Sequence, residues 1–219
     1  MKLLELAVRT FCDVEAKGVV DAAYLFGQTS DNQFSVLSAG AALIEKRRTG
    51  RLLLTESAPK SGYPGYACWK KELLQLGVPA ASISGVDLRE EDCLNTLIEA
   101  VGMMSYAKKN HYARLYIVAS PFHQLRAFMT SVTAALRIFP EVKIYSHTGN
   151  PLSWSDKVSH SQGKTIGSRK EVLQGELERI RAYQKKGDLA HEMDVLNYLD
   201  TRDTNRRKGW NSSKSRLTQ

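Results

Sequence analysis

Long hydrophobic runs, metal-binding cysteine spacings and a secretion signal are all missing from this 219-residue sequence. No apolar stretch approaches the roughly 20 residues that a helix needs to cross a bilayer. The first segment, 1–9, has an acid inside its short apolar stretch, which favours an amphipathic helix over a cleaved signal. Cys12, Cys68 and Cys93 are far apart, so their spacing predicts no zinc site and their odd number argues against a disulfide framework. We therefore expect a cytoplasmic protein with reduced thiols and no transmembrane segment.

Familiar nucleotide-binding and catalytic signatures are also absent. The sequence contains no Gly-x-Gly-x-x-Gly turn, no Walker phosphate loop and no Gly-x-Ser-x-Gly nucleophile elbow. Its tyrosines and tryptophans are scattered, without the series that stacks the bases of a single strand. Motifs alone therefore specify neither a dinucleotide nor a nucleoside triphosphate.

The net charge of +8 is concentrated at the C-terminal end. Residues 202–219 hold six lysines and arginines against one acid, Asp203, so they contribute +5 and the rest of the chain only +3. This segment is also rich in Ser, Thr and Asn, a composition that predicts disorder. A solvated terminus is the favoured interpretation, and binding of nucleic acid or an anionic surface by counterion release is the alternative.

Short apolar segments alternate along the chain with segments whose apolar residues recur at helical spacing. Strands are predicted over 19–27, 51–55, 81–84, 115–119 and 142–146; helices over 31–48, 68–76, 95–108, 122–139 and 166–186; and long loops over 57–66 and 147–164. This alternation predicts an α/β, three-layer Rossmann-like fold: a mostly parallel sheet with helices on both faces.

The predicted core faces of three helices and the domain limits follow from the same pattern. We expect one Rossmann-like domain over 1–190, with an N-terminal helix in 1–18, and a C-terminal extension over 191–219. The apolar faces are predicted to consist of Phe34, Leu37, Ala41 and Ile44; of Leu97, Ala100, Met104 and Ala107; and of Leu173, Leu177 and Ile180.

A single edge of the predicted sheet is expected to hold the functional site. Right-handed crossovers place the carboxyl ends of all parallel strands on the same edge, where α/β proteins bind ligands. The turns after Phe26, Thr55, Ala119 and Tyr145 therefore face one crevice.

The most informative segment, 114–127, places Ser120, His123 and Arg126 at that edge. Residues three apart share a helix face, so His123 and Arg126 can address one anionic group. Arginine binds phosphate or carboxylate in a bidentate manner, and histidine transfers protons near neutral pH. A cation near a helix N-terminus opposes the dipole, so a ligand or an acid such as Glu99 is expected to compensate Arg126.

The first two turns offer small polar groups. Gly27 lets the backbone approach a ligand, and with Gln28 it precedes a helix N-terminus that favours an anion. The alternative is that Gly27 only ends the strand and Asp31 only caps the helix. In the second turn Ser57 can donate to a phosphate or carboxylate, or simply face solvent.

The turn before the third helix offers Asn95 and Thr96, with Glu99 one turn further on. They either point into the crevice or only cap the helix, in an arrangement similar to a capping box. His147 and His160 can join the site, although single loop histidines are usually solvated.

In order and content these pieces resemble the YdcF/SanA/ElyC-like family of bacterial Rossmann-like domains of unknown function. The resemblance covers residues 19–190, and its matching pieces are Phe26-Gly27, Gly77-Val78-Pro79, Asn95-Thr96, Ser120-Pro-Phe-His123-Gln-Leu-Arg126-Ala127, Glu176 to Tyr183, and Gly187-Asp188-Leu189. The acid that usually follows the Asn-Thr pair is either shifted here to Glu99 or replaced, and Gly65-Tyr66-Ala67 stands where the family often has a glutamate.

The resemblance implies a Rossmann-like fold, S-adenosylmethionine binding as in one branch, and membership of the soluble branch. The favoured function is binding of a small anionic or nucleotide-like ligand, S-adenosylmethionine being suggested by the resemblance alone. The alternative is a hydrolase or transferase acting on a phosphorylated metabolite of envelope or nucleotide metabolism. There His123 would be the acid or base, with Glu99 a weaker candidate, and Arg126 would steady developing charge.

Overall fold

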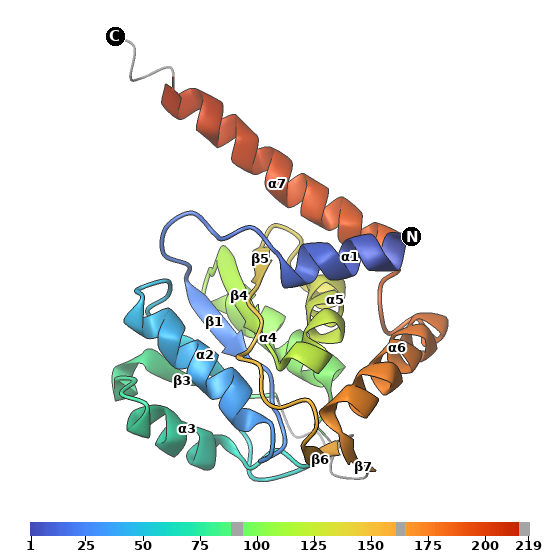
Figure 1. The fold of residues 1–219 in the computed structure, drawn as a ribbon. Coiled ribbons are helices and arrows are strands. Elements are labelled where there is room, and N and C mark those ends of the chain that lie inside the picture. Colours follow the sequence, from blue (N-terminus) through green and yellow to red (C-terminus); the bar gives the residue numbers. More distant parts are fainter. Residues whose placement is uncertain (89–93, 161–164, 215–219) are drawn as a thin grey trace.

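A five-stranded parallel sheet in the order β3-β2-β1-β4-β5 forms the centre of the protein (Figure 1). The computed structural model describes residues 1–88, 94–160 and 165–214, with side chains as far as residue 204 except that of His160. The strands are β1 (Ala22–Leu25), β2 (Leu52–Thr55), β3 (Ile83–Val86), β4 (Arg114–Val118) and β5 (Lys143–Ser146). Residues of β1 and β2 are buried throughout, as expected where helices cover both faces of a parallel sheet.

Helices flank this sheet, which confirms the predicted α/β, Rossmann-like architecture. Their bounds are α1 (Lys2–Phe11), α2 (Gln33–Glu45), α3 (Tyr66–Gln75), α4 (Thr96–Lys109), α5 (Pro121–Ile138), α6 (Arg169–Lys186) and α7 (Glu192–Lys214), with a short 3-10 turn at Ala80–Ser82. Helix α4 packs against α5, and α2 packs against α3.

The strand order reverses between β1 and β4, and this reversal opens the crevice at the carboxyl edge. From β1 the chain runs to β2 and β3, then crosses back through α4 to β4 on the other side of β1. Such a switch point is where open α/β sheets bind ligands, because the loops on its two sides diverge. Helix α2 begins after β1, α4 begins after β3, and α5 begins after β4. The N-termini of these three helices bound the site.

The segment predicted as a loop and helix start contains an antiparallel hairpin instead. Strand β6 (Lys157–His160) pairs with β7 (Thr165–Ser168), so α6 begins at Arg169 rather than at 166. Asp31 holds the hairpin by accepting a hydrogen bond from the Ser159 N–H at 2.7 Å. These strands are short, and β7 is largely exposed, so the sequence carried no apolar alternation to predict them.

Two predicted helix faces are partly wrong, and in α6 the reason is a buried charged residue on the face that packs inward. Leu173 and Leu177 are 42% and 37% exposed, and the buried face of α6 includes Val172, Glu176 and Ile180. Phe34 is likewise 56% exposed, whereas Leu37 of the same helix is buried. A hydropathy pattern does not identify the buried face of a helix when an ion-paired glutamate lies at the centre of that face.

The C-terminal extension begins with a helix that the sequence pattern did not predict. Helix α7 packs against α1 and α5, and its bounds extend to Lys214. Arg202 is buried and pairs with both carboxylate oxygens of Asp13 at 2.6 and 2.8 Å. It also donates to the carbonyl of Ile144 at 2.7 Å, so it joins α7 to the segment after α1 and to β5.

None of the helices within the described residues combines the length and apolar character that crossing a bilayer requires. The other basic side chains of the predicted tail, from Arg206 onward, lie outside the described side chains, as does Cys93.

Candidate functional site

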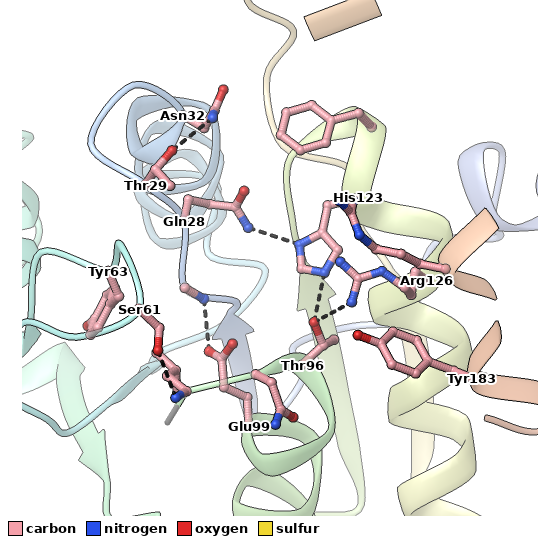
Figure 2. Close-up of a pocket in the computed structure, with 15 residues that line it drawn as sticks. Gln28, Thr29, Asn32, Ser61, Tyr63, Thr96, Glu99, His123, Arg126 and Tyr183 are labelled. Atoms are coloured by element: carbon pink, nitrogen blue, oxygen red, sulfur yellow. Dashed lines mark hydrogen bonds between the residues drawn. The ribbon is translucent and has the colours of Figure 1, made fainter. Parts of the chain in front are cut away.

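A cavity of about 340 Å³ opens at the switch point (Figure 2). Residues from the turns after β1 and β2, from the starts of α4 and α5, and from α6 line it. Its volume lies at the small end of the range for ligand pockets. Helix N-termini carry partial positive charge, so their convergence on one cavity favours an anionic occupant.

Most of the residues singled out from the sequence line this cavity. They are Gly27, Gln28, Asn95, Thr96, Glu99, His123 and Arg126. They come from three turns that are far apart in the chain, and the parallel sheet brings them together at its carboxyl edge.

The two predicted serines do not line the cavity. Ser120 is buried and donates to the Gln28 Oε1 at 2.8 Å, so it supports a lining residue instead. Ser57 donates to the neighbouring carbonyl of Ala58 at 3.0 Å. Helix α2 begins after Asn32, so Asp31 is not its N-cap.

His147, one of the two loop histidines, is not among the described residues that line this cavity. His147 packs against the ring of Tyr116, with centroids 5.6 Å apart, and its burial and the nearby Lys46 lower its pKa. The His160 side chain lies outside the described residues.

Other lining residues were missed by the sequence analysis, and those on α6 matter most. They are Thr29, Asn32, Ser61, Tyr63, Leu94, Phe122, Arg179 and Tyr183. Glu176, Arg179 and Tyr183 recur at i, i+3 and i+7, which is one helix face. That spacing was visible in the sequence, but nothing in it indicated that this face would cover the crevice.

Arg126 is compensated by Glu176 rather than by Glu99 as predicted. The Arg126 Nε and Nη2 both donate to the Glu176 carboxylate, the latter at 3.1 Å. The side chains of Arg126 and Glu176 are 11% and 3% exposed, so this is a nearly buried pair. Arg179 also donates to Glu176, at 2.7 Å, and its side chain is 27% exposed. One carboxylate therefore serves two guanidinium groups.

A chain of hydrogen bonds fixes the tautomer of His123. The Gln28 Nε2 lies 3.3 Å from the Phe26 carbonyl and 3.1 Å from the His123 Nδ1. An amide nitrogen can only donate, so Nδ1 accepts and the ring proton of a neutral imidazole sits on Nε2. That nitrogen lies 3.1 Å from the Thr96 Oγ1 and donates to it. Both ring nitrogens are thus engaged by protein groups.

Thr96 receives a second hydrogen bond, from the Arg126 Nη1 at 2.7 Å. A hydroxyl oxygen has two lone pairs and one proton. His123 and Arg126 fill the two lone pairs, so the Thr96 proton is left to point elsewhere. Because Thr96 lines the cavity, its hydroxyl is placed to donate to an occupant.

Glu99 is a buried carboxyl group in the cavity wall beside Gly27. Its Oε1 accepts from the Gly27 N–H at 2.8 Å and from the Thr55 hydroxyl at 2.9 Å, with the Tyr24 hydroxyl at 3.3 Å. Burial raises the pKa of Glu99 to about 7, although these hydrogen bonds and Arg126 lower it. The group can therefore exchange a proton near neutral pH, as an acid–base residue must.

No family model matches this sequence, and no curated protein matches it as a relative. The resemblance to the YdcF/SanA/ElyC-like family accordingly stays a prediction from its motifs. Function must be argued from the cavity itself.

Proposed function

We propose that the protein binds a small anionic or nucleotide-like ligand in the cavity at the carboxyl edge of the sheet. The observation that carries this proposal is the convergence of three helix N-termini on a cavity whose lining includes Arg126 and Arg179. Guanidinium groups beside helix N-termini suit a phosphate or carboxylate.

Arg179 is the residue we assign to the ligand's anionic group. Both arginines line the cavity, but Arg126 is held on two sides by Glu176 and Thr96, and Arg179 is the more exposed of the two. S-adenosylmethionine, which the family resemblance suggests, would present its carboxylate to this arginine.

Replacing Arg179 by alanine is expected to weaken binding of adenosine 5′-monophosphate or S-adenosylmethionine by about tenfold or more, because a charge-assisted hydrogen bond is lost. Isothermal titration calorimetry of the parent and the variant measures the change. Arg181→Ala, an exposed arginine of the same helix outside the cavity lining, is the matched control and should bind like the parent. Equal affinity of the Arg179 and Arg181 variants would contradict the assignment.

Catalysis on a phosphorylated metabolite is the second function, and the environment of Glu99 favours it. Its raised pKa makes Glu99 a better acid–base residue than His123, whose two nitrogens are occupied. We expect any turnover of sugar phosphates or nucleotides to show a kcat/KM transition near pH 7 that Glu99→Gln removes. Phosphate release followed from pH 5 to pH 9 tests this, and turnover without such a transition counts against Glu99.

A further inference from the structure

We propose that the ligand of this cavity is a hydroxylated anion, of the chemical class of a sugar phosphate, whose anionic group and hydroxyl groups are read at two separate places. This inference rests on the proposed binding function and adds the neutral half of the ligand. Figure 2 shows the separation: Glu99 lies on the side of Ser61 and Tyr63, Arg126 and Tyr183 lie opposite, and Thr96 lies between them.

The anionic group is recognised at the Thr96 and Arg179 side. His123 and Arg126 both donate to the Thr96 oxygen, which forces the hydroxyl of Thr96 to act as a donor toward the cavity. The Glu176 carboxylate accepts hydrogen bonds from the guanidinium groups of Arg126 and Arg179, so it does not repel an anion as an unpaired carboxylate would. A donor of fixed direction beside a cation matches an acceptor-only group such as phosphate.

The hydroxyl groups are recognised at the Glu99 and Ser61 side. Within the described part of the chain, the hydrogen bonds of the Glu99 carboxyl all reach Oε1, which leaves Oε2 to accept from an occupant. The Ser61 Oγ accepts from the Leu94 N–H at 3.1 Å, so its own proton can be donated. This side therefore offers an acceptor and a donor within one cavity.

A hydroxyl group matches such a pair, and an ammonium group or an apolar group does not. The hydroxyl group can donate to Glu99 and accept from Ser61, whereas an ammonium group can only donate and leaves the Ser61 proton unmatched. An apolar group would leave both unsatisfied, at the cost of a buried polar group without a partner. The neutral polar residues Thr29, Asn32 and Asn95 also line the cavity.

Calorimetry at pH 8 with ribose 5-phosphate and 1-pentyl phosphate tests the inference on the unaltered protein. The two ligands share a phosphate monoester and a five-carbon body, and only the first carries hydroxyl groups on it. We expect ribose 5-phosphate to bind about tenfold tighter or more, since it gains at least one hydrogen bond to a charged group. Equal affinities, or tighter binding of pentyl phosphate, would overturn the hydroxyl assignment while leaving anion binding in place. If neither phosphate binds, both the inference and the proposed function fail.

The Glu99→Gln variant locates the preference within the cavity. Its effect on the phosphate group applies to both ligands, so the ratio of the two affinities reports the hydroxyl contact alone. We expect that ratio to fall about fivefold, because the amide nitrogen that replaces Oε2 cannot accept the proton of the ligand's hydroxyl group. The exposed Glu141→Gln is the matched control and should keep the parent ratio. An unchanged ratio in Glu99→Gln would overturn the assignment of the hydroxyl contact to Glu99.

Discussion

Replacing Glu99 by glutamine is expected to stabilise the protein at pH 8 by about 3 kcal/mol and to leave its stability nearly unchanged at pH 4.5. The cause is burial, which raises the pKa of this carboxyl from the ordinary 4.5 to about 7. Glutamine has a similar shape and can accept the Gly27 hydrogen bond, but it never carries the charge that the buried site disfavours.

The pH dependence of the Glu99 effect has a definite sign. Between pH 4.5 and pH 7 the folded protein holds a proton on Glu99 that the unfolded chain has released, so stability falls as the pH rises through this window. Above pH 7 the loss is complete. Urea unfolding at pH 4.5, 6, 7 and 8 should therefore show that the free energy of unfolding of the variant increases relative to that of the parent as the pH rises. A glutamine variant less stable than the parent at pH 8 would mean that the ionised carboxylate is net favourable in the fold.

A stabilising change in a cavity wall would itself be informative. Residues that serve binding or catalysis are commonly held in environments that cost stability. A gain at Glu99, paired with loss of ligand preference or turnover, would identify the carboxyl as functional rather than structural.

Glu176→Gln is expected to destabilise the protein by about 3 to 5 kcal/mol, the range for breaking a buried ion pair from one side. Arg126 would keep its charge in a nearly buried position with only Thr96 and a neutral amide as partners. Glu178→Gln lies two residues away on the exposed face of the same helix and is the control, with an expected change within about 0.5 kcal/mol. Chemical denaturation of both variants at pH 7 measures the difference.

A second substitution separates charge from packing at the Glu176 position. Arg126→Met together with Glu176→Leu removes both members of the pair, so no buried charge is left unpaired and most of the stability should return. If the double variant recovers the stability of the parent, the destabilisation in Glu176→Gln came from the unpaired, buried guanidinium group of Arg126. A loss below about 1 kcal/mol in Glu176→Gln alone would show instead that water reaches Arg126 and screens its charge.

The sheet and its edge were predictable because their signals are local. The apolar runs at 51–55 and 115–119 became β2 and β4 within one residue, and Asn95 caps α4 through hydrogen bonds to the Leu97 and Ile98 N–H groups. Strand polarity then placed the turns on one edge without any knowledge of distant contacts.

The contribution of α6 to the cavity wall was not predictable from the sequence, because it depends on how this helix packs against the rest of the fold. A hydropathy pattern assigns buried faces to apolar residues, so it chose Leu173 and Leu177 and passed over Glu176. Glu99, the acid predicted to compensate Arg126, instead accepts hydrogen bonds from Gly27 and Thr55. Paired charges at a buried interface carry no signature that a single sequence reveals.

The contact between Asp13 and Arg202 can form only late in the synthesis of this chain. The two residues are 189 positions apart, and Asp13 also accepts from the Ser146 N–H of β5. A ribosome therefore releases the whole sheet before the cation that neutralises its edge emerges. Until then a carboxylate destined for the interior lacks its cationic partner, so we expect the incomplete chain to be more accessible to proteases and chaperones than the full-length protein.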